Sequence, residues 1–251
     1  VHDNQYIILP EVEGNELEKD KVRDAVIKAV KEGTPSIDLE KLGFYKEPSV
    51  RSTDENLNAQ VNTVNVMLSS SITYDFVDRQ MTVGREDIIN WIVDNGDGTY
   101  SLNRDGVYAW VGNMGYETDT FGLNHPFMTS YGVEVMLAPG GDYGWYIDQD
   151  ETTDILYQYI LAGQTAVVQP EYVYTAMDRT KYDIGNTYVE ICITTQTLWC
   201  YYNGELITTT PIISGNEATG FCTPSGSVWA IDGKKTDWQF TYFPNAFSKF
   251  W

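Results

Sequence analysis

The sequence predicts an α+β N-terminal domain over residues 1–183, followed by an all-β portion over residues 184–251. Apolar residues recur at helical spacing only before Gly163, and beyond Pro170 short runs typical of strands alternate with turn residues. No low-complexity linker separates the helical pattern from the strand pattern. We therefore expect the boundary near 180–186 and close packing between the two parts.

The composition limits the classes of partner. The chain has 251 residues, a net charge of -20, and 18 Tyr, 7 Trp and 9 Phe. Disordered chains are poor in aromatic residues, so we expect a folded protein. Its negative charge repels nucleic acid and anionic lipid, which excludes nucleic-acid binding and favours a protein outside the cell or a substrate that carries amines.

The sequence has neither a membrane-spanning run nor a signal peptide. No apolar run reaches the length that a bilayer requires, so no direct membrane span is expected in this chain. The N-terminus lacks the basic and apolar regions of a leader. Val1 is not a methionine, which favours a piece cut from a longer protein that has room upstream for a membrane anchor.

Helices are expected where apolar residues recur every three or four positions. The first such run ends at Gly33, a typical helix stop, and Asp54 is a good N-cap for the second. The last run begins at Asp150 and ends at Gly163. The expected helices cover residues 17–30, 55–68, 85–93, 107–114 and 150–162.

Strands and turns fill the rest. We expect strands over 72–76 and 127–137, and the loop 140–145 leads into a further short strand. The run 94–99 has several calcium-loop residues but lacks the bidentate glutamate, so we interpret it as a polar turn between a helix and a strand. His125 is interpreted as a loop histidine and not a ligand, so no metal site is expected.

Three cysteines lie in the last quarter of the chain, so at least one is unpaired. Cys192 and Cys200 flank a turn near Thr195–Gln196. Two alternatives stay open: a cross-strand disulfide between these two, or free buried thiols at Cys192, Cys200 and Cys222. No cysteine has a histidine nearby in sequence, which argues against a catalytic thiolate.

Four motifs follow one another in the all-β portion. They are residues 186–191 (Asn-Thr-Tyr-Val-Glu-Ile), 196–204 (Gln-Thr-Leu-Trp-Cys-Tyr-Tyr-Asn-Gly), 213–216 (Ile-Ser-Gly-Asn) and 223–226 (Thr-Pro-Ser-Gly). This order resembles the opening strands of the L,D-transpeptidase (YkuD-type) catalytic domain of bacterial peptidoglycan enzymes, and implies an incomplete YkuD-like β-sandwich or barrel. Within it, Asn203-Gly204 predicts a type I′ hairpin turn.

The first part resembles the peptidoglycan-binding domain that often precedes the YkuD-type domain in Gram-positive bacteria. The residues that carry this resemblance are 37–39, 45–48, 72–74, 118–122, 142–148 and Gly163. It implies a location outside the cell, in the cell wall or on the surface of a Gram-positive bacterium. The implied partner is peptidoglycan, through its stem peptides or its glycan.

In this family a cysteine thiolate attacks a tetrapeptide stem, D-alanine leaves, and a second stem takes the acyl group to give a 3→3 crosslink. The nucleophile lies in a Ser-His-Gly-Cys motif, which is absent from this sequence. His2 and His125 lie in the first part. We therefore expect a truncated, inactive transpeptidase with no catalytic residue and no cofactor. The tail from about Ser214 is expected to be mobile or paired with a neighbouring chain.

Four residues are candidates for substrate binding. The rings of Tyr143, Trp145 and Tyr146 suit stacking on sugars, although such rings also fill ordinary cores. Thr223, in the Thr-Pro-Ser-Gly turn, lies near the cleft if the resemblance carries over, or in a plain turn if it does not. The alternative function is a non-catalytic cell-surface module that binds peptidoglycan or carbohydrate, with Trp251 close to its natural end. A protein–protein adhesin is a third reading, which only the acidity favours.

Overall fold

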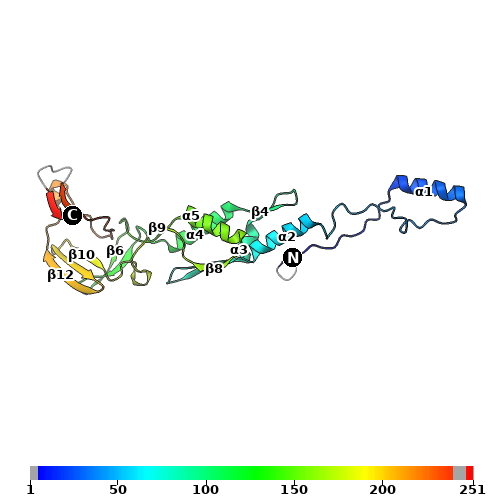
Figure 1. The fold of residues 1–251 in the computed structure, drawn as a ribbon. Coiled ribbons are helices and arrows are strands. Elements are labelled where there is room, and N and C mark those ends of the chain that lie inside the picture. The colour runs from blue at the N-terminus through cyan, green and yellow to red at the C-terminus, as the bar shows by residue number, and fades with distance from the viewer. Residues whose placement is uncertain (1–4, 240–246, 251) are drawn as a thin grey trace.

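The structure is a computed structural model that describes residues 5–239 and 247–250. It has an α+β fold of elongated shape (Figure 1). Helix α1 (Lys19–Glu32) stands at one end, the helices of a packed core lie in the middle, and a small antiparallel sheet lies at the other end.

Helix α1 forms where the sequence predicts it but buries none of its residues. Gly33 ends it in the left-handed conformation, and Thr34 N donates to Ala29 O. Val30 stays 76% exposed. The helix stands away from the core on two extended segments, which are held together by backbone bonds such as Lys46 N to Glu16 O, 2.8 Å.

Helix α2 (Glu55–Leu68) confirms its predicted N-cap. The Asp54 carboxylate accepts a hydrogen bond from Leu57 N at 2.9 Å, which satisfies one of the unpaired donors of the first turn. At the other end of the helix, Val64, Met67 and Leu68 are buried. The apolar stripe that predicted this helix therefore supplies one wall of the core.

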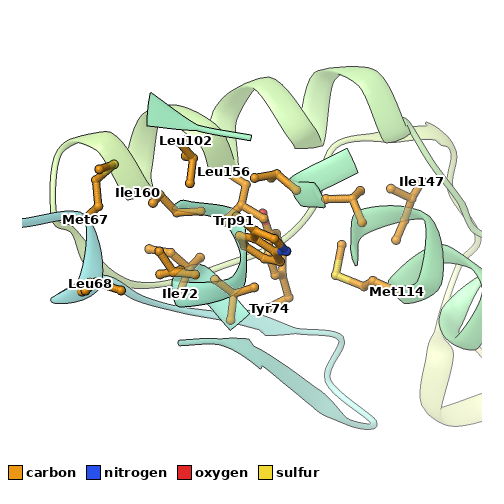
Figure 2. Close-up of a cluster of buried hydrophobic side chains, with 14 of the residues drawn as sticks. Met67, Leu68, Ile72, Tyr74, Trp91, Leu102, Met114, Ile147, Leu156 and Ile160 are labelled. Atoms are coloured by element: carbon orange, nitrogen blue, oxygen red, sulfur yellow. The ribbon is translucent and has the colours of Figure 1, made fainter. Parts of the chain in front are cut away.

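The core forms around a three-stranded sheet. Its middle strand β1 (Ser71–Asp75) pairs with β2 (Gln80–Val83) in antiparallel and with β8 (Thr165–Val168) in parallel orientation. Ile72 and Tyr74 alternate onto the buried face. Helices α4 (Arg104–Thr118) and α5 (Gln149–Leu161) cover it, and Figure 2 shows side chains from α5 and β1 in the same cluster as Trp91.

Gly163 confirms the predicted stop of α5 and also allows close packing. Its φ is +66°, in the left-handed region that favours glycine. A Cβ at this position would lie 2.9 Å from both Val66 Cγ1 and Val66 O. Only glycine therefore lets α5 turn into β8 beside α2.

The helix predicted over 85–93 is wrong in its length. Helix α3 covers only Arg85–Ile88, η1 (Ile89–Trp91) follows as a 3-10 turn, and Ile92–Asp94 forms strand β3, which pairs with β4 (Tyr100–Leu102). Trp91 packs into the core, and its carbonyl accepts a bond from Asn103 N at 2.7 Å. The polar turn predicted over 94–99 is therefore present, but it joins two strands and not a helix and a strand. Asp94 Oδ1 accepts from Gly96 N.

The single strand predicted over 127–137 is also wrong. The structure has a hairpin of β5 (His125–Met128) and β6 (Glu134–Leu137). The chain reverses between them at Gly132, where φ is +74°. Thr129 N donates to Val133 O at 2.9 Å and closes the turn. Gly132 is the local signal for a reversal inside the alternating run.

Beyond α5 the described residues form strands and 3-10 turns, and no α-helix. Strand β9 (Tyr172–Tyr174), beyond α5, pairs with β7 (Tyr146–Ile147), which precedes α5. Asn203 and Gly204 have φ of +50° and +84°, as the predicted type I′ turn requires. The remaining elements are η2 (Arg179–Lys181), β10 (Tyr188–Cys192), β11 (Thr197–Tyr202), β12 (Glu205–Pro211), η3 (Glu217–Thr219), β13 (Thr236–Gln239) and β14 (Phe247–Phe250).

Strands β10, β11 and β12 form one antiparallel sheet, and β13 and β14 form another. Among the strands that the structure describes, β12 pairs with β11 alone, and each of its residues is exposed. The hairpin β13–β14 does not extend this sheet. Mobility of the tail beyond Ser214 stays a prediction.

The cysteines do not face one another. Cys192 lies opposite Thr197, and Cys200 lies opposite Val189. The cross-strand disulfide is therefore wrong, because the register of β10 and β11 places the two thiols at separate positions along the hairpin. Cys192, Cys200 and Cys222 are all free, but none is fully buried, so the expectation of buried thiols is wrong as well: Cys192 and Cys200 are partly buried and Cys222 is exposed.

Within residues 5–239 and 247–250, no helix has both the length and the apolar character that a bilayer crossing requires.

The core predicts a sharp contrast between two aliphatic side chains. Ile160 is fully buried, whereas Val30 is 76% exposed. Replacing Ile160 with Ala should lower the free energy of unfolding by about 3 kcal/mol, because a cavity replaces packed atoms. Val30→Ala, the control, should change it by less than about 0.5 kcal/mol. Urea denaturation followed by tryptophan fluorescence measures both, and equal losses would contradict the described core.

Candidate functional site

The loop before β7 is clamped by the segment that follows α4. Thr120 N and Phe121 N both donate to Trp145 O, at 2.9 and 3.0 Å, and Trp145 N donates to Thr120 Oγ1 at 3.0 Å. Gly144 has φ of +133°, and a Cβ there would lie 2.5 Å from Phe121 N. The clamp therefore requires glycine, and it fixes the position of Trp145.

The candidate binding residues do not form one surface. Tyr143 is half-buried, and its hydroxyl donates to Asp183 O and accepts from Met177 N, both at 2.9 Å. Tyr146 is 46% exposed. The Thr223 hydroxyl accepts from Gly215 N at 2.7 Å, in the last quarter of the chain. A binding role for Tyr143, Trp145, Tyr146 and Thr223 stays a prediction.

Tyr146 belongs to an exposed aromatic group on the β7–β9 pair. Its ring centroid lies 6.1 Å from that of Phe121 and 6.4 Å from that of Tyr174. Phe121 and Tyr174 stack at 4.3 Å. Rings held in this way by their neighbours lose little conformational freedom when they meet a flat ligand.

Trp145 lines a cavity of about 170 Å³, which we name the Arg179 cavity. Its walls come from the end of β1, the clamped loop, the β8–β9 connection and the start of η2. The lining residues are Phe76, Val77, Trp145, Gln169, Tyr172, Met177, Asp178 and Arg179.

The Arg179 guanidinium is held by aromatic faces and by the end of a helix. It lies 4.8 Å from the ring centroid of Trp145 and 5.9 Å from that of Tyr172. Nη1 donates to Thr118 O at 2.8 Å. Thr118 is the last residue of α4, and the carbonyls there carry the negative end of the helix dipole. The cation is therefore stacked and anchored at once.

The ionisable groups around Arg179 respond to burial and to its charge. Burial raises the pKa of the Asp119 carboxyl, while a hydrogen bond from Ile147 N and the charge of Arg179 oppose the rise. Burial also raises the pKa of Tyr172, and Arg179 again opposes it. The cavity thus lies in a region of reduced solvation, where a charged ligand interacts more strongly than at the open surface.

The predicted loop position of His125 is wrong, because the residue belongs to a strand. Among the described residues, no group of His, Cys, Asp and Glu could hold a metal ion. His125 begins β5 and is 3% exposed, and its Nε2 lies 3.2 Å from Asp183 Oδ2. Asp183 is buried as well. The pair joins the β5–β6 hairpin to the segment at the predicted domain boundary. His2 lies outside the described residues.

A second link joins the hairpin to the sheet of β10–β12. Glu190 is buried on β10, and its carboxylate accepts two bonds from Ser130 N, at 2.9 and 3.1 Å, and one from Ser130 Oγ at 2.6 Å. The ring of Tyr131 meets that of Trp199 edge-on, 5.2 Å between centroids. These contacts join residues on the two sides of the predicted boundary, and the close packing of two domains stays a prediction. The boundary at 183 stays a prediction.

Sequence reasoning missed Arg179 and Glu190. Arg179 and Lys181 form a small basic group in an acidic chain just before the predicted boundary, which was a usable signal. No sequence signal marked Glu190, because an acidic residue within an alternating strand looks like an ordinary solvent-facing position. Only the three-dimensional structure places Ser130 beside it.

The cysteines give no nucleophilic arrangement that the sequence analysis overlooked. Hydrogen bonds from the Thr195 side chain and backbone lower the pKa of the Cys192 thiol. The described histidine, His125, is engaged with Asp183. The absence of a catalytic residue stays a prediction.

Among the comparisons with known proteins, only the comparison with solved structures gives matches. No family model matches the chain, and no curated protein matches it. A cysteine-to-serine mutant of the Enterococcus faecium L,D-transpeptidase is similar, with 28% identity and a TM-score of 0.56 over 71% of this chain and 69% of its own. The Ldtfm–avibactam carbamoyl enzyme is similar with 27% identity and a TM-score of 0.60, over 78% of this chain and 76% of its own.

The structural neighbours are thus L,D-transpeptidases. A match to 78% of the chain is longer than the segment 1–183, so it includes part of the all-β portion. The likeness is therefore not confined to the packed core.

The clamp predicts a contrast between two glycines with positive φ. At Gly132 a Cβ meets nothing within 4 Å, whereas at Gly144 it meets the backbone of Phe121. Gly132→Ala should cost about 1 kcal/mol of stability, from the backbone conformation alone. Gly144→Ala should cost at least about twice as much, because it also displaces the 118–122 segment. Urea denaturation measures both, and equal costs would refute the clamp.

Proposed function

We propose that this chain is the leading portion of a peptidoglycan L,D-transpeptidase. The segment 1–183 acts as a peptidoglycan-binding domain, and the sheet of β10–β12 opens a YkuD-like catalytic domain. The observation that carries the proposal is the likeness to two solved L,D-transpeptidases across more than two thirds of the chain. The order of motifs from residue 186 to residue 226 agrees with it.

In the proposed reaction a cysteine thiolate attacks the stem carbonyl, releases D-alanine and passes the acyl group to a second stem. That chemistry needs a thiolate, a base and donors for the oxyanion. The sequence contains no Ser-His-Gly-Cys motif. The part that this chain plays is therefore to bind and position peptidoglycan, and the chemistry belongs to residues outside it.

The proposed location is the cell wall or outer surface of a Gram-positive bacterium. Peptidoglycan lies there, and a net charge of -20 suits a wall polymer that carries amines. Fractionation of the source cells, with detection of the chain by antibody, tests the location directly.

A non-catalytic peptidoglycan-binding module is the alternative. One observation favours it: the Arg179 cavity and the Tyr146 aromatic group both lie within the segment 1–183, apart from all three cysteines. The coding sequence after Trp251 separates the two functions. A histidine followed by Ser-His-Gly-Cys supports the transpeptidase, and a stop codon supports the module.

The proposal predicts no acyl transfer by this chain alone. Incubation with a tetrapeptide stem should release no D-alanine above the level without protein, because the nucleophile is absent. Coupled oxidation of D-alanine measures the release, and an L,D-transpeptidase with its cysteine intact is the positive control. Release that depends on this chain would refute the assignment of the chemistry to other residues.

The proposal also predicts binding to peptidoglycan sacculi through exposed aromatic rings. Tyr146→Ala should weaken binding about threefold to tenfold, the range expected for one lost stacking contact. Tyr116, 92% exposed on α4, provides the matched control, and Tyr116→Ala should leave binding unchanged. Co-sedimentation with purified sacculi measures both. Equal effects of the two substitutions would remove Tyr146 from the binding surface.

A further inference from the structure

Arg179 is a partly buried cation that forms no close ion pair among the described residues, although its charge acts on Asp119. The chain has 36 acidic and 16 basic residues, yet within the described part no carboxylate oxygen lies within 4.0 Å of its guanidinium. The groups that contact it are neutral: Thr118 O, Tyr172 Oη and three aromatic rings. A cation that is partly removed from water gains most from a ligand that brings the opposite charge.

The cavity also holds hydrogen-bond donors that are not used. A guanidinium carries five N–H donors in a planar fork that matches a carboxylate, and the bonds to Thr118 and Tyr172 use only part of them. Among the described residues, the remaining N–H groups of Arg179 have no acceptor, so the guanidinium can take one from a ligand.

Two acidic residues lie at or near the cavity: Asp178 is part of its wall, and the charge of Arg179 acts on Asp119. Asp178 Oδ1 accepts from Thr180 N at 2.9 Å and from Thr180 Oγ1 at 2.6 Å. Asp119 Oδ1 accepts from Ile147 N at 3.0 Å. Each carboxylate therefore has a backbone donor, and neither forms an ion pair with Arg179 within 4.0 Å.

The size and walls of the cavity limit what enters. About 170 Å³ is smaller than the roughly 300 Å³ or more of sites for drug-sized ligands. Phe76, Val77 and Met177 add apolar surface, which suits a methyl group. The guanidinium and Tyr172 already pack against Trp145, which disfavours the stacking of a sugar ring there.

We propose that the Arg179 cavity binds the terminal carboxylate of a short peptide that ends in a small residue, as the D-alanine end of a peptidoglycan stem does. The carboxylate pairs with the guanidinium, and the methyl group meets the apolar wall. This assignment rests on the proposed function. It names the C-terminal end of a peptide, rather than a glycan, as a ligand of the segment 1–183.

The first test needs no variant. A tetrapeptide stem that ends in D-alanine is compared with the same peptide amidated at its C-terminus, by isothermal titration calorimetry on the full chain. The free acid should bind about tenfold more tightly, because the amide removes a charge-assisted pair. Equal affinities would overturn the proposal. Acetate or free D-alanine as tight as the peptide would overturn the assignment to a peptide end.

Amino-acid substitutions then test whether Arg179 causes the preference for the free acid over the amide. Arg179→Gln should abolish the difference between acid and amide. Arg104→Gln is the matched control, because Arg104 is an arginine on α4 that pairs with Asp154 at 2.6 Å. Circular dichroism confirms folding of each variant. A preference that survives Arg179→Gln in a folded protein would overturn the proposal.

Binding to intact sacculi separates this inference from the proposed function. Sacculi that bind while the peptides show no acid–amide preference would overturn the cavity assignment and leave the proposed function standing. Sacculi and peptides that both fail to bind would overturn the two together. Sacculi that bind and lose affinity on Arg179→Gln, but not on Arg104→Gln, would support both.

Discussion

The burial of strand β1 against α2, α4 and α5 is the constraint on which the rest of the structure depends. Ile72 and Tyr74 enter the core, and the strand then leads into Phe76, which is buried and also lines the Arg179 cavity. Helix α4 ends at Thr118, whose carbonyl holds the guanidinium. The cavity is thus assembled from the ends of core elements, so the free energy that stabilises the core also fixes the geometry of the cavity.

The coupling between the core and the β-rich portion relies on polar groups that are buried and paired. His125 meets Asp183 at one end of the β5–β6 hairpin, and Ser130 meets Glu190 at its turn. A buried carboxylate left without its donors costs far more than the bond itself contributes. The β5–β6 hairpin therefore connects the packed core to the sheet of β10–β12.

The sequence correctly predicted those caps and turns that depend on interactions within a few residues. Asp54 as an N-cap, Gly163 as a stop and Asn203-Gly204 as a tight turn all act within a few residues, and the structure has each of them. The strand pairing of β10 with β11 is a different case, because the register that separates Cys192 from Cys200 depends on the whole sheet. The sequence analysis missed Arg179 because its partners, such as Phe76 and Thr118, are distant in sequence and become adjacent only after folding.

Helix α1 and the extended segments that carry it contain no buried residue between positions 5 and 51. Basic residues such as Lys41 and Lys46 lie there, on backbone that the core does not protect. Trypsin should therefore cleave this arm before any site in the core, because proteolysis selects backbone that is exposed and weakly held. The arm then behaves as a detachable element, and the fragment that begins near α2 retains the packed core, the cavity and the sheet.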